Sequence, residues 1–104
     1  MFTLVMAFAL AAPNPASLDA PRRAYATCLK SFETNQLKAK VAPEAYEAAI
    51  KAACQAEAAA LTEALIRYDV AMGTKRPAAM SNAERDIEDY RLTSVERYRD
   101  RLAN

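Results

Sequence analysis

The sequence predicts a small all-α domain of three helices, and three observations support this prediction. The chain has 104 residues, which is enough for one domain of ordinary size. It contains 25 alanines and one glycine, a composition that favours long helices over strands. Apolar residues recur at intervals of three and four residues, which is the spacing of one helix face.

An apolar segment precedes the expected helices. Residues 2–12 are apolar apart from Thr3, and Ala9-Leu10-Ala11 forms the small-residue pattern of a signal-peptide cleavage site. No Lys or Arg precedes this segment, and it is too short to span a bilayer. We therefore expect a signal peptide over residues 1–11, a single helical domain over residues 12–104, and a periplasmic or secreted protein with no stable membrane span after cleavage. An N-terminal helix packed on the domain, or a hydrophobic arm, is the alternative.

The first helix is expected over residues 20–37. Pro21 falls in its first turn, where a proline loses no helical hydrogen bond. The apolar side of this segment is formed by Leu18, Tyr25, Cys28, Leu29 and Phe32. Glu33 and the basic residues are expected mostly outside this stripe.

The second and longest helix is expected over residues 43–72, and Gly73 ends it while Pro77 prevents its resumption. Its bulky apolar stripe is Tyr46, Ile50, Cys54, Ala58, Leu61, Leu65, Tyr68 and Met72. Beside this stripe lies a face of small residues: Ala45, Ala49, Ala52, Ala56 and Ala60. Small side chains allow helices to approach closely, so this alanine face is a candidate helix-packing or self-association surface. A helix that is apolar on two sides is expected to be the central element.

The third helix is expected over residues 81–102, where Ser81 and Glu84 fit a capping box. Its thinner apolar stripe is Ile87, Tyr90, Val95, Tyr98 and Leu102. We expect this charged helix to pack on the long central helix. Six carboxylates are interleaved with its five arginines, which favours a solvated, salt-bridged face over a nucleic-acid interface. The apolar stripes also carry four tyrosines at regular spacing, whose hydroxyl groups are expected near the surface: Tyr25, Tyr46, Tyr68 and Tyr90.

Cys28 and Cys54 are predicted to form a disulfide. Each lies about three helical turns from the expected turn over residues 38–43, so an antiparallel hairpin brings the two cysteines level. In an oxidising compartment such a pair forms a disulfide by default. A catalytic redox pair usually has the Cys-x-x-Cys spacing, which is absent from the sequence.

The composition also excludes several kinds of chemistry. The chain has no histidine, which is the most common general base and transition-metal ligand. One glycine cannot form a Gly-rich phosphate loop, and no carboxylate cluster has the spacing of a calcium loop. Glu57 falls inside the bulky stripe and could act as a general acid, but we expect a rim residue paired with a basic side chain of the first helix. We therefore expect no enzyme, no cofactor and no metal.

The remaining hypotheses are binding and structural roles. The first is a small exported helical protein that acts through protein–protein contacts or self-association, without nucleic acid. The second is a periplasmic stress chaperone that shields unfolded clients on an amphipathic surface. The third is an inhibitor or immunity-type protein for an exported enzyme, which no specific residue favours. The net charge of +1 gives no strong attraction to nucleic acid or to an anionic membrane.

Overall fold

A computed structural model describes residues 13–104 of the chain, and this part is all helical, as predicted. The elements are the 3₁₀ helix η1 (Pro15–Leu18), α1 (Asp19–Lys38), α2 (Pro43–Ala49), the 3₁₀ helix η2 (Ile50–Ala52), α3 (Gln55–Ala71) and α4 (Arg76–Ala103). Residues 13–104 contain no strand. The expected signal peptide over residues 1–11 lies outside the described residues. No described helix has the length and apolar character needed to cross a bilayer.

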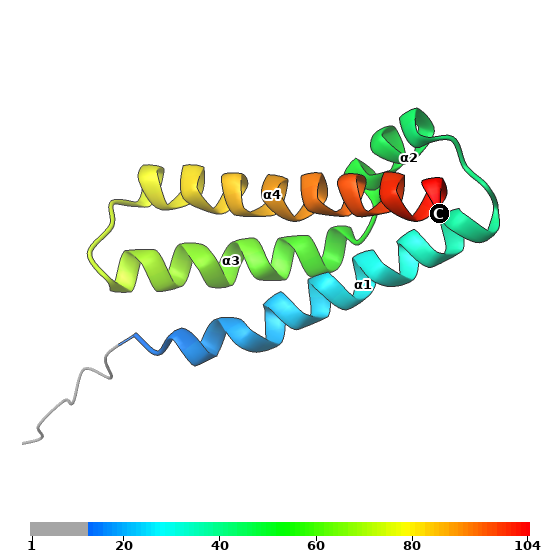
Figure 1. Cartoon of the computed structure of the whole chain (residues 1–104). Helices are drawn as coiled ribbons and strands as arrows, with labels where there is room; N and C mark the ends of the chain where they lie inside the picture. Colours follow the sequence, from blue (N-terminus) through cyan, green and yellow to red (C-terminus); the bar gives the residue numbers. More distant parts are fainter. Residues whose placement is uncertain (1–12) are drawn as a thin grey trace, which may run out of the picture.

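The three long helices lie side by side (Figure 1). α3 runs antiparallel to both α1 and α4, and it contacts both of them. The short α2 lies across the C-terminal half of α4. α1 also contacts α4 directly, so the domain has one core shared by all the long helices.

The prediction of one continuous helix over residues 43–72 is wrong. The segment is divided into α2, η2 and α3, and the break falls at Ala53, which is extended, and Cys54, which is left-handed with φ 57°. Neither glycine nor proline lies near the break. The cause is tertiary packing: the bend turns α2 onto α4, where the ring of Tyr46 stacks on that of Tyr98 at a centroid distance of 3.8 Å.

The third helix begins at Arg76 and not at Ser81. Pro77 lies in the first turn of α4, where its missing N–H costs no hydrogen bond, so it starts this helix instead of preventing it. Gly73 ends the preceding helix as predicted, with φ 99°. Its N–H donates to the Val70 carbonyl and the Thr74 N–H donates to the Asp69 carbonyl, which is the Schellman pattern of a helix C-terminus.

The core contains the predicted apolar stripes, with the tyrosines deeper than expected. Tyr25, Tyr46 and Tyr98 are fully buried, so the expectation of a hydroxyl group near the surface is wrong for Tyr25 and Tyr46. The buried apolar residues are Leu18, Tyr25, Leu29, Tyr46, Ile50, Ala58, Leu61, Leu65, Ala79, Ala83, Ile87, Val95 and Tyr98. Met72 and Leu102, predicted on apolar stripes, are exposed because they lie near the helix ends.

Candidate functional site

A carboxylate is buried between α1 and α4. Glu33 follows Tyr25 and Leu29 at intervals of four residues, so the three side chains share the buried side of α1. The expectation that Glu33 lies outside the apolar stripe is wrong, because its side chain is fully buried. The four-residue spacing from Tyr25 is the sequence signal that could have located it.

Two arginines of α4 neutralise this carboxylate. Arg97 donates from Nε to both oxygens of Glu33 at 2.9 Å and from Nη2 to Oε2 at 2.8 Å. Arg101 donates from Nη1 to Oε1 at 3.3 Å. The Ser94 hydroxyl donates to Oε2 at 3.2 Å. We call Glu33, Ser94, Arg97 and Arg101 the Glu33 cluster, which joins the first and last long helices.

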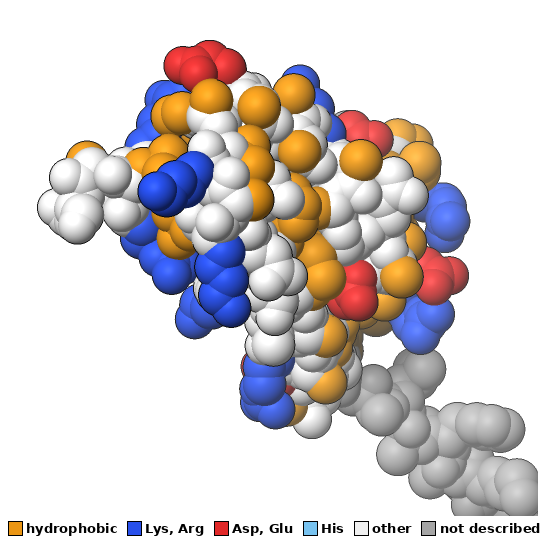
Figure 2. Space-filling view, turned by 90° about the vertical axis from the view of Figure 1, so that its right-hand side faces the viewer, with side chains coloured by type: hydrophobic (Ala, Val, Ile, Leu, Met, Phe, Trp, Pro, Cys, Tyr) orange, Lys and Arg blue, Asp and Glu red, His pale blue; other side chains and the backbone are white. Residues whose placement is uncertain are grey.

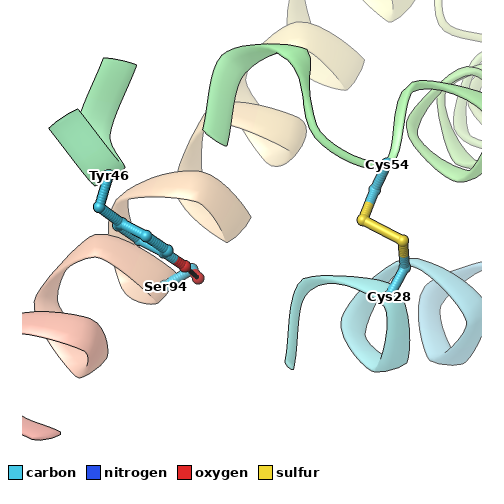
Figure 3. Close-up of a disulfide and its surroundings, with 4 residues drawn as sticks. All are labelled: Cys28, Tyr46, Cys54 and Ser94. Carbon is cyan, nitrogen blue, oxygen red and sulfur yellow. Dashed lines mark hydrogen bonds between the residues drawn. A yellow bond between two sulfur atoms is a disulfide. The ribbon is translucent and has the colours of Figure 1, made fainter. Parts of the chain in front are cut away.

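The cluster continues to Tyr46 on α2. The hydroxyl oxygens of Tyr46 and Ser94 are 2.6 Å apart, and Figure 3 shows the tyrosine pointing toward the serine. Because the Ser94 proton is given to the Glu33 carboxylate, Tyr46 is the donor to Ser94. The chain of donors therefore runs from Tyr46 through Ser94 to Glu33 and ties α2 to the α1–α4 pair.

The surroundings of Glu33 hold it in the charged form. Burial by itself raises the pKa of this carboxyl, but the hydrogen bonds and charge of Arg97, with the hydrogen bonds of Arg101 and Ser94, outweigh burial and leave the pKa below its ordinary value. The Glu33 hydrogen bond likewise raises the pKa of the Arg97 guanidinium. Glu33 is therefore ionised at neutral pH, and both of its oxygens accept hydrogen bonds.

A groove of about 460 Å³ lies between α1 and α4 beside this cluster. It is lined by Arg22, Ala26, Leu29, Lys30, Asp86, Asp89, Tyr90, Thr93 and Arg97. Ala26, Leu29 and Tyr90 supply its apolar lining, and charged side chains of both signs supply the rest. We call this hollow the α1–α4 groove.

The charges around the α1–α4 groove differ in how they are satisfied. Arg22 is 3.6 Å from Asp86 and donates to the Tyr90 hydroxyl at 3.3 Å. Arg97 belongs to the Glu33 cluster. Lys30 on α1 and Asp89 on α4 form no salt bridge within the part of the chain that is described. The groove therefore presents one unpaired cation and one unpaired anion, from different helices.

The predicted disulfide between Cys28 and Cys54 is present, with the two Cα atoms 6.0 Å apart (Figure 3). It joins α1 to the start of α3. Both sulfurs and a carboxylate oxygen of Glu57 lie within 4.8 Å of one another. Cysteine binds a metal ion as the thiolate, and neither cysteine is a thiolate while the disulfide is closed. These three residues therefore cannot form a metal site in the disulfide-bonded protein. Glu57 forms no salt bridge in the described region, contrary to the expected pairing with the first helix.

The predicted alanine face does not form one helix surface, because the break at Cys54 divides it. Ala45 and Ala49 are on α2, Ala52 is on η2, and Ala56 and Ala60 are on α3. Ala49 is half-buried and the other four are exposed. Figure 2 views the end of the molecule that carries α2. Hydrophobic side chains form a band through the middle of the surface seen in that view. Self-association through these alanines stays a prediction.

The arginines of α4 form more salt bridges with other helices than within their own helix. Within α4 the described residues form one ion pair, Arg91–Glu88 at 3.7 Å. The other arginine pairs of this helix cross to other helices: Arg97 and Arg101 to Glu33, and Arg99 to Glu47 at 3.0 Å. Helical periodicity reports spacing along one helix, so it could not identify these partners.

Together the fold and the site define a disulfide-bonded, all-helical protein with a mixed-charge groove between two helices. No protein-family model, curated protein or solved structure matches this chain. The functional argument therefore depends on the residues of the chain itself.

Proposed function

We propose that this chain is a small exported helical binding protein that acts through protein–protein contacts and without catalysis. The observation that supports this most is the α1–α4 groove, whose apolar lining lies beside the unpaired Lys30 and Asp89. An apolar contact area bordered by polar groups is the usual composition of a protein-binding surface. The groove suits a partner segment that presents an apolar side chain between one acidic and one basic residue.

The walls of the groove are held in place from two sides. The Glu33 cluster joins α1 to α4, and the disulfide joins α1 to the start of α3. A surface that is ordered before binding loses less conformational entropy when the partner binds. This rigidity favours a recognition surface over an adaptable one.

The state of Glu33 supports a role without catalysis. A general acid at neutral pH needs a carboxyl whose pKa is raised toward 7. The pKa of Glu33 is instead lowered, and both of its oxygens accept hydrogen bonds from arginine. Its chemistry is that of a structural ion pair.

The disulfide supports the proposal of export, because such bonds persist in oxidising compartments. The mass of the protein recovered from the periplasm or the medium tests this part. We expect a chain that begins at residue 12 and has lost the two thiol protons. A chain that retains residue 1 and carries two free thiols contradicts export.

Site-specific crosslinking tests the binding proposal. A photo-reactive benzoylphenylalanine is placed at Ala26, which lines the groove, or at Ala24, which is exposed on the same helix and lies outside the lining. We expect a protein adduct from position 26 in native cells and none from position 24. Mass spectrometry then identifies the crosslinked protein.

Binding of the purified partner decides the outcome. Ala26→Trp fills the groove and is expected to lower the affinity at least about tenfold, whereas Ala24→Trp leaves it unchanged. Equal affinities of the two variants contradict the groove as the binding surface. Suppression of aggregation of a denatured client by both variants supports the chaperone alternative, and inhibition of an exported enzyme by both supports the inhibitor alternative.

A further inference from the structure

The turn between α3 and α4 exposes large apolar side chains. Val70, Met72 and Met80 are 43%, 60% and 45% exposed, and they make up three of the five large hydrophobic residues that the described chain leaves exposed. All three lie within eleven residues of sequence around one turn. A gathering of exposed apolar side chains at one place indicates a contact surface.

The same turn is basic. Residues 67–80 contain Arg67, Lys75 and Arg76 and a single acidic residue, Asp69, which accepts a hydrogen bond from Asn82. The three cations are exposed and form no salt bridge within residues 13–104. Arg67 and Arg76 line one hollow together with Val70, Ile66 and the carboxylate of Glu63, so two of the three cations lie beside Val70.

The start of α4 adds to this positive potential. Lys75 precedes the helix, Arg76 begins it, and its first turn contains no acidic residue and no capping side chain. Helix N-termini carry a partial positive charge and normally attract acidic side chains. The two cations at this end are therefore destabilising within the helix, and an external anion would stabilise them.

The described chain begins at this same end of the molecule. Pro13, Asn14 and Ser17 line a hollow with Arg67 and Tyr68 near the end of α3. Figure 1 shows the start of the described residues and the α3–α4 turn at the same side. The exposed methionines and the unpaired cations of the α3–α4 turn thus lie at the end of the molecule where the described residues begin.

We propose that the α3–α4 turn is a docking surface for an anionic lipid bilayer. Val70, Met72 and Met80 enter the headgroup region, while Arg67, Lys75 and Arg76 contact lipid phosphates. A nucleic acid would satisfy the cations and leave the methionines in water. A bilayer interface satisfies both kinds of group, because it offers anionic headgroups above an apolar interior. This proposal concerns a different surface from the α1–α4 groove and does not depend on it.

Co-sedimentation of the full chain with vesicles tests the proposal. The vesicles contain equal parts of phosphatidylglycerol and phosphatidylcholine, or phosphatidylcholine alone. We expect binding to the anionic vesicles that weakens as salt is added. The double variants Lys75→Glu/Arg76→Glu and Met72→Ser/Met80→Ser are each expected to lower the partition coefficient about tenfold or more. The first variant also places acidic residues at a helix N-terminus, which favours folding.

Two matched variants at other places serve as controls. Lys38→Glu/Lys40→Glu makes the same change of charge at the far end of α1, and Leu92→Ser/Leu102→Ser removes two other exposed apolar side chains. Both are expected to bind vesicles like the unchanged chain. Equal binding by all four variants overturns the proposal. A dimer in solution that Met72→Ser/Met80→Ser converts to monomer also overturns it, because a second copy is then the occupant.

Hydrogen exchange separates docking by the turn from binding by the apolar segment alone. On anionic vesicles we expect slowed exchange in peptides that cover residues 69–80 and unchanged exchange in peptides that cover residues 38–45. Protection confined to residues 1–12 overturns the proposal.

Discussion

Arg97 of α4 holds the fully buried carboxylate of Glu33 with three hydrogen bonds of 2.8–2.9 Å, across 64 residues of sequence. A carboxylate without such partners would not remain ionised in the core, because burial of an unpaired charge is costly. Arg101 and Ser94 satisfy the oxygens further. The Glu33 cluster therefore helps to fix the relative position of α1 and α4, and with it the α1–α4 groove.

Replacement of Glu33 by glutamine should destabilise the fold. Glu33→Gln removes the charge that Arg97 and Arg101 neutralise and leaves amide protons facing a guanidinium. Because the two arginine side chains remain 38% and 43% exposed, water offsets part of the loss, and we expect a decrease of about 2 kcal/mol in the free energy of unfolding in urea.

The matched control for this variant is Glu47→Gln. The Glu47–Arg99 pair has a similar distance of 3.0 Å, but its side chains are 48% and 52% exposed. We expect a change of no more than about 0.5 kcal/mol from an exposed pair of this kind. Equal effects of the two variants would show that burial adds nothing to the Glu33 cluster.

The contribution of Glu33 should depend on pH. The pKa of this carboxyl is lower in the folded chain than in the unfolded chain, where it is about 4.3. Its contribution to stability is therefore fully present above about pH 4.3 and is lost as the pH falls through the folded-state pKa. Urea unfolding of the unchanged chain and of Glu33→Gln should give a difference that is constant from neutral pH to about pH 5 and narrows in more acidic solution. A difference that grows on acidification contradicts the assignment.

The sequence predicted the helical class, the disulfide and most core residues, because periodicity and cysteine register are local properties. It could not predict the break at Cys54. The segment from Ile50 to Cys54 contains no helix-breaking residue, and the bend is stabilised by the distant contact of Tyr46 with Tyr98 and Ser94. Local propensity carries no information on such a contact.

The candidate site was predicted less well than the fold. Every residue of the Glu33 cluster is charged or polar, and binary patterning assigns such residues to the surface. The buried position of Glu33 depends on Arg97, which lies on another helix. The α1–α4 groove is likewise made by two helices that are far apart in the sequence. Pairing between distant helices is the step that one sequence does not specify.

The buried tyrosines should respond differently to loss of the hydroxyl group. Tyr46 donates to Ser94, so Tyr46→Phe leaves that serine without its donor and should lower the free energy of unfolding by about 1–2 kcal/mol. The Tyr25 hydroxyl is buried and has no hydrogen-bond partner in the described structure, so Tyr25→Phe should change it by less than about 0.5 kcal/mol. Thermal or urea unfolding of both variants provides the comparison. A larger loss of unfolding free energy from Tyr25→Phe than from Tyr46→Phe would contradict the hydrogen bonding assigned to the two hydroxyl groups.

The turn after α1 contains a residue in an unfavourable conformation. Lys40 is left-handed with φ 54°, and its N–H donates to the Leu37 carbonyl. Glycine adopts this conformation without the steric cost that a side chain brings, so Lys40→Gly should raise the free energy of unfolding by about 0.5–1 kcal/mol. The neighbouring Ala39 has a right-handed conformation, and Ala39→Gly should lower the free energy of unfolding by a similar amount. Urea unfolding of both variants checks the opposite signs, and two changes of the same sign would contradict the explanation.

Loss of the disulfide should lower the free energy of unfolding more than any of these substitutions. The bond between Cys28 and Cys54 links positions 26 residues apart, and closing a loop of this length restricts the unfolded chain by about 3 kcal/mol. We expect Cys28→Ser/Cys54→Ser to lose about this amount in urea unfolding, and the unchanged chain to lose the same amount when it is reduced. Agreement between the two measurements assigns the loss to the bond. A loss confined to the serine variant would instead assign it to the half-buried hydroxyl groups, and equal stability of all three samples would show that the Glu33 cluster and the apolar core fix α1 without the disulfide.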